Sequence, residues 1–316
     1  MEKFKESFKL YKRKKPPPDY SNVIDFTKID AEDRQVCSLI LEKQSCDVLD
    51  GMIPFTSWKA YQHRKIPGFY FISNPFTPDG QRKWIKRCLN DFPLKPNITN
   101  LDVNYSDLIR ERNVWSMHLD ADSTDEEKQL LHKLRWSTLG YHHNWDTKKY
   151  TADRYTPFPD DLSCLSRCIA HGIGFPHFKA EAAIVNYYHL DSTLSGHTDH
   201  SEFDHISPLI SISFGQTAVF LLGGLTKDID PIALYLHSGD ICIMSGECRL
   251  AYHAVPKILR TPTSELPYHE GDDDTVNGRK VEDTFEPFES YLQSSRINMN
   301  VRQVLCDGQE FPKDES

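Results

Sequence analysis

Three side chains of this sequence have the types and the order expected of ligands for one metal ion: His197, Asp199 and His253. Two imidazoles and one carboxylate can occupy one face of a metal ion and leave its other coordination positions open to small molecules. His197 and Asp199 are two residues apart, so on a strand both side chains point to the same face. We expect a distant strand to bring His253 close to them.

The sequence contains three His-x-Asp pairs, at residues 118–120, 189–191 and 197–199, and only their context separates them. The first opens an acidic run and is predicted to lie in a loop before a helix. The second ends a strand-like segment at a turn. The third lies between two predicted strands, where ligand side chains can reach a cavity. Taken alone, a His-x-Asp pair is most often a surface or capping pair, and His253 is equally well explained as a core histidine.

A second polar cluster lies near the end of the chain. The strand predicted over residues 296–304 carries polar side chains at every second position: Arg296, Asn298, Asn300 and Arg302. A guanidinium group pairs with a carboxylate through two parallel hydrogen bonds, so this face is predicted to bind a dicarboxylate. Asn186 and Tyr188 are also two residues apart and are predicted to bind the same cosubstrate. The alternative is an exposed edge strand with a polar outer face.

Together, the two polar clusters indicate oxidation chemistry. A metal ion held by two histidines and one carboxylate, with open positions, is typical of non-haem Fe(II) oxygenases. The arginine pair adds a binding face for an acidic cosubstrate. The sequence therefore predicts an enzyme that uses Fe(II), a 2-oxo acid and O₂.

Many short strands are predicted to position these residues. After Lys179 they cover residues 182–190, 207–214, 217–222, 232–236, 240–244, 248–254 and 296–304. Short strands separated by turn signals favour a sandwich or a jelly roll. Upstream, a strand is predicted over 68–73 and helices over 3–15, 81–89, 125–134 and 160–170. Residues 20–66 are expected to be mostly helical or irregular, and the acidic segment 264–283 to be a flexible loop.

Aromatic residues are scattered without a clean period over residues 136–160. This composition predicts a long aromatic loop or a hairpin lid, although ordinary packing of a connecting segment explains it equally well. The candidate substrate-contacting residues fall in this segment, and they are Tyr141, His143, Asn144, Trp145 and Tyr150.

Length and composition limit the classes of protein. With 316 residues, of which 39% are hydrophobic, the chain can build one large or two modest domains. No segment approaches the roughly 20 apolar residues of a membrane span, and no secretory signal is visible. The eight cysteines have no paired CxxC spacing, which argues against zinc and favours reduced thiols inside a cell.

The net charge of −9 argues against a polyanionic partner for the chain as a whole. However, residues 1–20 contain seven Lys or Arg against three acids, and residues 58–95 contain eight against two. Local basic patches, rather than the total, govern phosphate contacts. Each run by itself is more simply explained as a solvated face.

The pattern Asn186-x-Tyr188, His197-x-Asp199, His253 and Arg296-x-Asn298-x₃-Arg302 resembles the AlkB-type Fe(II)/2-oxoglutarate dioxygenases over about residues 66–305. Residues 135–145 and the phrase Tyr155-Thr-Pro-Phe-Pro are similar to the eukaryotic AlkB homologue one branch. The resemblance implies an α+β, mainly β fold. It would have a double-stranded β-helix (jelly-roll) core, N-terminal helices and a nucleotide-recognition lid.

The resemblance also implies roles for individual residues. His197, Asp199 and His253 would bind iron, and Arg296 would pair with the far carboxylate of 2-oxoglutarate. Asn186, Tyr188, Asn298 and Arg302 would complete the cosubstrate pocket. The implied substrates are methylated nucleobases, namely methyladenosine or methylcytidine in tRNA and N6-methyladenine in DNA. The implied locations are nucleus and mitochondrion, and we expect a monomer that does not bind membranes.

These expectations divide the chain into four segments. Residues 1–65 form a helical and basic N-terminal extension, and residues 66–180 form supporting helices and the nucleotide-recognition lid. Residues 181–306 form the catalytic core, and residues 307–316 form a C-terminal tail.

Two other functions fit parts of the same pattern. A 2-oxoglutarate oxygenase acting on protein side chains keeps the whole centre and changes only the lid. A catalytically inactive nucleic-acid-binding module keeps the fold without the chemistry, although three intact ligand positions argue against it. A cupin-like module that stores metal or binds sugar would not need the arginine face.

Overall fold

The computed structural model describes residues 2–29, 35–41, 49–269, 275–276, 279–280 and 285–312. Two antiparallel sheets form its centre. The larger has nine strands in the order β1 (Val36–Leu39), β2 (Lys59–His63), β3 (Phe69–Ser73), β11 (Ile241–Met244), β8 (Leu209–Gly215), β15 (Ser295–Arg302), β6 (Ala182–His189), β5 (Trp136–Gly140) and β4 (Ile98–Thr99). The smaller has four in the order β10 (Ile232–Leu236), β9 (Thr217–Leu222), β12 (His253–Leu259) and β7 (Leu194–His197). The predicted jelly-roll core is confirmed.

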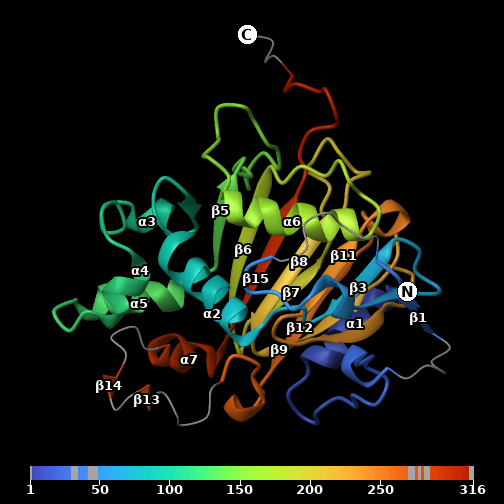
Figure 1. Ribbon diagram of the computed structural model, residues 1–316, viewed down its shortest axis with the longest axis horizontal. Helices are drawn as coiled ribbons and strands as arrows, with labels where there is room; N and C mark the ends of the chain where they lie inside the picture. The colour runs from blue at the N-terminus through green and yellow to red at the C-terminus, as the bar shows by residue number, and fades with distance from the viewer. Residues whose placement is uncertain are drawn as a thin grey trace.

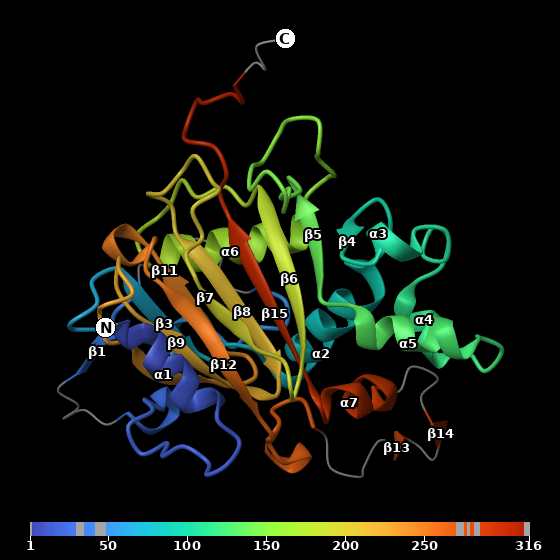
Figure 2. The ribbon, with the colours of Figure 1, turned by 180° about the vertical axis from the view of Figure 1, so that it is seen from behind.

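Helices cover the outer faces of both sheets. Figure 1 shows α2 (Pro78–Lys86) and α6 (Asp160–Gly172) across the nine-stranded sheet, and Figure 2 shows α1 (Lys3–Lys12) on the opposite side, beside the four-stranded sheet. Further helices lie beyond the β4 edge and at the start of β15: α3 (Asp102–Tyr105), α4 (Val114–Leu119), α5 (Asp125–Lys133) and α7 (Glu286–Leu292). One apolar core lies between the helices and the larger sheet, and a second lies between the two sheets.

The alternation predicted for the last strand is present in β15. Ile297, Met299 and Val301 pack into the core under the helices. Because successive side chains of a strand point to opposite faces, the polar residues of β15 face the smaller sheet. β15 lies in the middle of the nine-stranded sheet, between β6 and β8, which excludes the alternative of an exposed edge strand.

The helix ends follow local sequence signals. Thr124 and Glu127 form a reciprocal capping box at the start of α5. Thr77 caps α2, and Pro78 occupies its first turn. α6 has acidic residues in its first turn and His171 in its last, in line with the helix dipole. α2 is followed by a short π-helical turn, Arg87–Asp91.

Two local predictions were wrong. The strand predicted over 248–254 is absent up to residue 252: a 3₁₀ turn (Gly246–Cys248) opens this stretch, and β12 begins only at His253. Gly246 has a positive φ of 49°, and the Cys248 amide donates to the Ser245 carbonyl, so turn hydrogen bonds replace the ladder. His118 lies in α4 rather than in a loop. The described part of residues 20–66 is mostly irregular, as expected, although β1 and β2 also lie there.

The aromatic segment 136–160 begins as β5 and continues into a hairpin, which we call the lid. Bridges pair Tyr141 with Tyr155 and Asn144 with Lys149. The hairpin form of the predicted lid is therefore present. Half of the acidic segment 264–283, namely residues 270–274, 277–278 and 281–283, lies outside the described residues. The described half includes part of a short turn (Thr263–Glu265) and the pair β13 (Thr275–Val276) and β14 (Arg279–Lys280).

The predicted division into four segments stays a prediction. β1, β2 and β3 pair into the same sheet as the strands of the predicted catalytic core, and β4 and β5 extend its other edge. Among the described residues, no helix has the length and apolar character needed to cross a membrane.

Candidate metal centre and cosubstrate pocket

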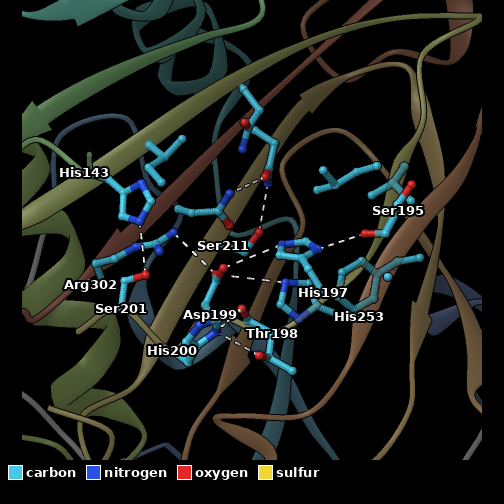
Figure 3. A pocket seen from close by; sticks show the side chains of 18 of the residues that line it. His143, Ser195, His197, Thr198, Asp199, His200, Ser201, Ser211, His253 and Arg302 are labelled. Atoms are coloured by element: carbon cyan, nitrogen blue, oxygen red, sulfur yellow. Dashed lines mark hydrogen bonds and ion pairs between the residues drawn. The ribbon is translucent and has the colours of Figure 1, made fainter. Parts of the chain in front are cut away.

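The ends of two neighbouring strands bring the three predicted ligands together. His197 is the last residue of β7, and His253 is the first of β12 and lies opposite His197 in the register. Asp199 follows two residues after the end of β7, so it converges on the histidines from a turn rather than along the strand. One ligand atom from each residue lies within 4.8 Å of the others. Figure 3 shows the three side chains pointing toward one another.

Hydrogen bonds orient both imidazoles. The Nδ1 atom of His197 lies 3.0 Å from the Ser195 carbonyl, and that of His253 lies 3.1 Å from the Ala251 carbonyl. Donation from Nδ1–H to these carbonyls leaves each Nε2 lone pair free. The two Nε2 atoms lie 3.6 Å and 4.0 Å from the Asp199 carboxylate oxygens. Such backbone bonds are how ligating histidines are held in proteins, so this donor set fits a divalent metal ion.

Burial and neighbouring charges keep Asp199 and His253 in the protonation states that bind metal. Burial alone would raise the pKa of Asp199, but Arg302 and the two imidazoles outweigh burial, and its pKa is well below the usual range. Burial, followed by the neighbouring His197, lowers the pKa of His253 to about 4. Near neutral pH the site therefore offers a carboxylate and a neutral buried imidazole.

The predicted cosubstrate residues line the face of the nine-stranded sheet that is directed at the ligands. Arg296 pairs with Tyr188, and Asn298 pairs with Asn186, across the β15–β6 ladder. Asn186, Tyr188, Arg296, Asn298 and Arg302 all line the same cavity as the three candidate ligands. Burial raises the pKa of Tyr188 to about 12, so its phenol stays protonated and can donate a hydrogen bond.

Arg296 is fully buried and is fixed by neutral acceptors. Its Nη1 donates to the carbonyls of Gln216 and Leu236, both at 3.0 Å, and its Nη2 donates to Ser213 Oγ at 2.6 Å. Within the part of the chain that the structure describes, its Nε has no hydrogen-bond partner. Among the described residues no carboxylate pairs with it, and burial lowers its pKa to about 10. A buried guanidinium group with only neutral acceptors around it can bind the carboxylate of a ligand.

A buried charge network below the ligands was not predicted. Glu202 accepts from Arg302 Nη1 at 3.0 Å and from Arg249 Nη2 at 2.9 Å. Arg302 also lies 3.5 Å from Asp199, and Arg249 donates to the Asp199 carbonyl at 2.7 Å. Burial raises and the two arginines lower the pKa of Glu202, with a net lowering. Glu202 therefore serves as a shared counter-ion for both arginines.

The lid closes one side of this cavity, which has a volume of about 570 Å³. His143 and Trp145 are the predicted lid residues that line it. His143 Nε2 lies 3.0 Å from the hydroxyl of Ser201, which connects the lid to the loop after Asp199 (Figure 3). Trp145 is 47% exposed, with its ring centroid 4.6 Å from that of His143. Both are placed to meet a substrate that enters the cavity.

The other three candidate substrate residues do not line the cavity. The ring of Tyr141 packs on Tyr155, with centroids 4.7 Å apart. The Asn144 side chain accepts hydrogen bonds from two backbone amides of the lid turn, at 3.0 Å and 3.1 Å. Tyr150 is 2% exposed and packs beside Ala182, so its ring has no free face for a nucleobase. All three support the lid from within.

Further lining residues of the lid and of the turn after β7 were not predicted, among them Lys148 and Ser201. Lys148 carried a signal, because it is one of two lysines in the turn of an expected hairpin. Ser201 carried none, because its contact with His143 depends on how the lid folds back over the barrel.

Comparison with known proteins agrees with this site. The model of the 2OG-Fe(II) oxygenase superfamily matches residues 68–302. The chain therefore belongs to the 2OG-Fe(II) oxygenase superfamily, whose members use Fe(II) and 2-oxoglutarate. The matched segment contains every candidate ligand and cosubstrate residue.

Several relatives cover most of the chain. The nucleic acid dioxygenase ALKBH1 of Homo sapiens is 44% identical over 334 aligned residues, which cover 98% of this chain and 85% of the relative. The DNA N(6)-methyladenine demethylase ALKBH1A of Arabidopsis thaliana is 36% identical and covers 76% of each chain. The tRNA demethylase abh1 of Schizosaccharomyces pombe is 36% identical, over 78% of this chain and 82% of the relative.

Proposed function

We propose that this protein is an Fe(II)- and 2-oxoglutarate-dependent dioxygenase that removes or oxidises methyl groups on nucleobases. One observation carries the proposal. Two imidazoles with free Nε2 atoms and one carboxylate share a lidded cavity with a buried, carboxylate-free arginine. Metal ligands alone would fit many enzymes, and the buried Arg296 adds the requirement for an acidic cosubstrate.

His197, Asp199 and His253 would hold Fe(II), and Arg296 would bind the far carboxylate of 2-oxoglutarate. Asn186, Tyr188, Asn298 and Arg302 complete the polar floor on which the cosubstrate lies. When bound, Fe(II) with 2-oxoglutarate and O₂ supplies the oxidant for a C–H bond of a methyl group. The chain itself supplies placement, because the ladder between β15 and β6 fixes the floor before the cosubstrate binds.

A nucleobase can reach this cavity only outside its stack. It either flips out of a duplex or already lies in a loop. Trp145 lines the cavity and is half-exposed, so its indole can stack on a base, and stacking on an aromatic ring contributes about 1–3 kcal/mol per base. The hydroxylated product of an N-methyl group releases formaldehyde, whereas a hydroxylated C5-methyl group stays on the base.

Names of the relatives support both RNA and DNA as substrates. The human relative is called a nucleic acid dioxygenase, the fission-yeast relative a tRNA demethylase and the plant relative a DNA N(6)-methyladenine demethylase. We propose methylated tRNA as the first substrate class to test and DNA as the second. The monomeric state and the nuclear or mitochondrial location stay predictions.

Asp199→Ala tests the role of the candidate metal centre. The variant lacks one of three ligands, so we expect formation of succinate from 2-oxoglutarate to fall to background. Binding of tRNA, measured by fluorescence anisotropy, should change little because Asp199 lies inside the cavity beside the two histidines and not on the lid. Retained succinate formation would contradict the assignment of this centre. Succinate formation that rises when a peptide library is added, but not when tRNA is added, would favour the alternative of an oxygenase acting on proteins.

A further inference from the structure

Lys148 is a cation in the cavity lining that the proposed chemistry does not use. It lies in the turn of the lid, between Asn144 and Lys149, and it lines the cavity together with the metal centre. The other two strong cations of the lining are committed, Arg302 to Asp199 and Glu202, and Arg296 to backbone carbonyls. Within the described part of the chain, Lys148 has no carboxylate partner.

The backbone holds Lys148 in a conformation that lysine rarely adopts. Its φ is +56°, in the left-handed region where glycine or asparagine is the low-cost choice. The turn enforces this conformation, because the Lys148 amide donates to the Asn144 carbonyl at 2.7 Å and the Asn144 amide donates to the Lys149 carbonyl at 3.0 Å. A strained lysine at a cavity mouth, where glycine would fit, suggests a function for its side chain.

The chemistry of the substrate indicates what this cation can bind. A nucleotide whose base enters the cavity leaves its two phosphate groups at the mouth, beside the lid. The mouth also carries Trp145, which is half-exposed and lines the cavity. A lysine ammonium is a compact point charge that contacts a phosphate oxygen without demanding bidentate geometry.

We propose that Lys148 binds a phosphodiester oxygen of the nucleotide whose base is oxidised. The proposal rests on the proposed function, because it assigns the phosphate site for that same nucleic-acid substrate. Lys148 then holds the backbone of the flipped nucleotide at the lid while the base reaches the metal centre.

Lys149 provides a matched control. It has the same charge, is exposed like Lys148 and is its immediate neighbour, but it does not line the cavity. If only the overall charge of the lid matters, Lys148→Met and Lys149→Met will weaken nucleic-acid binding equally. If Lys148 contacts a phosphate group, only Lys148→Met will weaken it. Lys148→Arg keeps the charge, and Lys148→Gly removes the ammonium while suiting the positive φ.

The test measures binding of an RNA hairpin with one N1-methyladenosine in its loop, without O₂ and with Mn(II) in place of Fe(II). For Lys148→Met and Lys148→Gly we expect affinity at 0.1 M KCl to fall about tenfold, as for one lost charged hydrogen bond. The slope of log affinity against log salt should become shallower by about 0.7–0.9. Lys149→Met and Lys148→Arg should stay close to the unmodified protein.

Three outcomes separate the two proposals. Equal losses in Lys148→Met and Lys149→Met would overturn the phosphate site, because only the general charge of the lid would then matter. A loss of RNA affinity in Lys148→Met but not in Lys148→Gly would also overturn it, because the effect would then come from the backbone and not from the missing ammonium group. Absence of RNA and DNA binding by the unmodified protein, with succinate still formed, would instead overturn the nucleic-acid function itself.

Discussion

Glu202 is the residue that holds the charged floor of the site together. Its two oxygens accept from Arg302 and Arg249, and its side chain is completely shielded from solvent. Arg302 in turn lies 3.5 Å from the candidate ligand Asp199. Because buried ions are costly unless they are paired, each of these groups depends on the others.

We expect Glu202→Gln to destabilise the fold strongly. The amide keeps the shape of the side chain but leaves two buried guanidinium groups without their counter-ion, and breaking such a pair costs about 3–5 kcal/mol. Urea unfolding followed by tryptophan fluorescence measures the change. Asp307→Asn is the control: it breaks the solvent-exposed pair with Lys179 and should leave the free energy of unfolding nearly unchanged. Similar losses in both variants would show that the buried network contributes no special stability.

The sequence predicted some residues of the site and missed others for a clear reason. The sequence predicted Arg296, Asn298 and Arg302 because polar and apolar residues alternate along this strand, and this pattern can be seen in the sequence itself. Glu202 and Arg249 were missed because their pairing depends on the 3₁₀ turn before β12, where the sequence predicted a strand. Lone charged residues in turns carry no periodic signal.

Helix α1 is the element that supports the metal-binding edge from outside. Phe4, in its first turn, is 2% exposed and lies between the backbones of two glycines. A Cβ atom at Gly196 would lie 2.6 Å from the Phe4 ring, and one at Gly223 would lie 2.7 Å from it. Gly196 directly precedes His197 in β7, so the helix packs against the strand that carries a candidate ligand.

Phe4→Ala should leave a cavity under α1. Truncation of a buried phenylalanine costs about 3–5 kcal/mol, so we expect the free energy of unfolding to fall by that order. Phe8→Ala, on the same helix, is the control, because Phe8 is only partly buried and should cost much less. Differential scanning fluorimetry gives the ranking, and urea unfolding gives the magnitude. Equal effects of the two substitutions would mean that the Phe4 contact does not anchor the helix.

A contact between Asp25 and His237 links the 3₁₀ turn η1 (Phe26–Lys28) to the end of β10. Asp25 accepts from Thr27 and lies 3.2 Å from His237 Nε2. Burial raises its pKa, but hydrogen bonds from Thr27 and Lys28 together with the charge of His237 outweigh burial and lower the pKa to about 2. A carboxyl group with a depressed pKa stabilises the folded state above its unfolded pKa, and this stability is lost as pH falls toward the folded value.

Asp25→Asn should therefore destabilise the protein at pH 7 by about 2 kcal/mol. The difference from the unmodified protein should be constant from neutral pH down to about pH 5, and it should shrink by roughly half near pH 3. Urea unfolding of both proteins across this pH range measures the difference. A difference in the free energy of unfolding that grows as the pH falls would exclude this role of the Asp25 carboxylate.

The sequence predicted the strands whose residues are apolar throughout or alternate between apolar and polar, as their burial in the fold requires. β6, β8, β9 and β15 were found nearly to the residue because their residues alternate or are apolar throughout. β1 and β2 were missed because they lie at one edge of the sheet, where β1 pairs with β2 and β2 pairs with β3, and their half-exposed residues leave no clean pattern. Long-range pairing, rather than local preference, makes those residues strands.

At the scale of the whole molecule, two sheets and one lid assemble a site from distant parts of the chain. The larger sheet supplies the polar floor, the smaller sheet and the turn after β7 supply the metal ligands, and the hairpin after β5 (Figure 1) contributes further lining residues. The sequence predicted the sheets and the lid separately. It did not predict that His143 contacts Ser201, because that contact exists only once the lid lies over the barrel.

We expect the protein to oxidise a methylated base in nucleic acid. The most direct measurement loads the protein with Fe(II) and 2-oxoglutarate without O₂, adds total tRNA or, in a parallel sample, genomic DNA, then admits O₂ and quantifies modified nucleosides by mass spectrometry. We predict loss of a methylated adenosine, or conversion of 5-methylcytidine to an oxidised form, with matching succinate. Neither change should occur with His197→Ala or Arg296→Ala. Unchanged nucleosides in both tRNA and DNA, with 2-oxoglutarate still consumed, would contradict the nucleic-acid function.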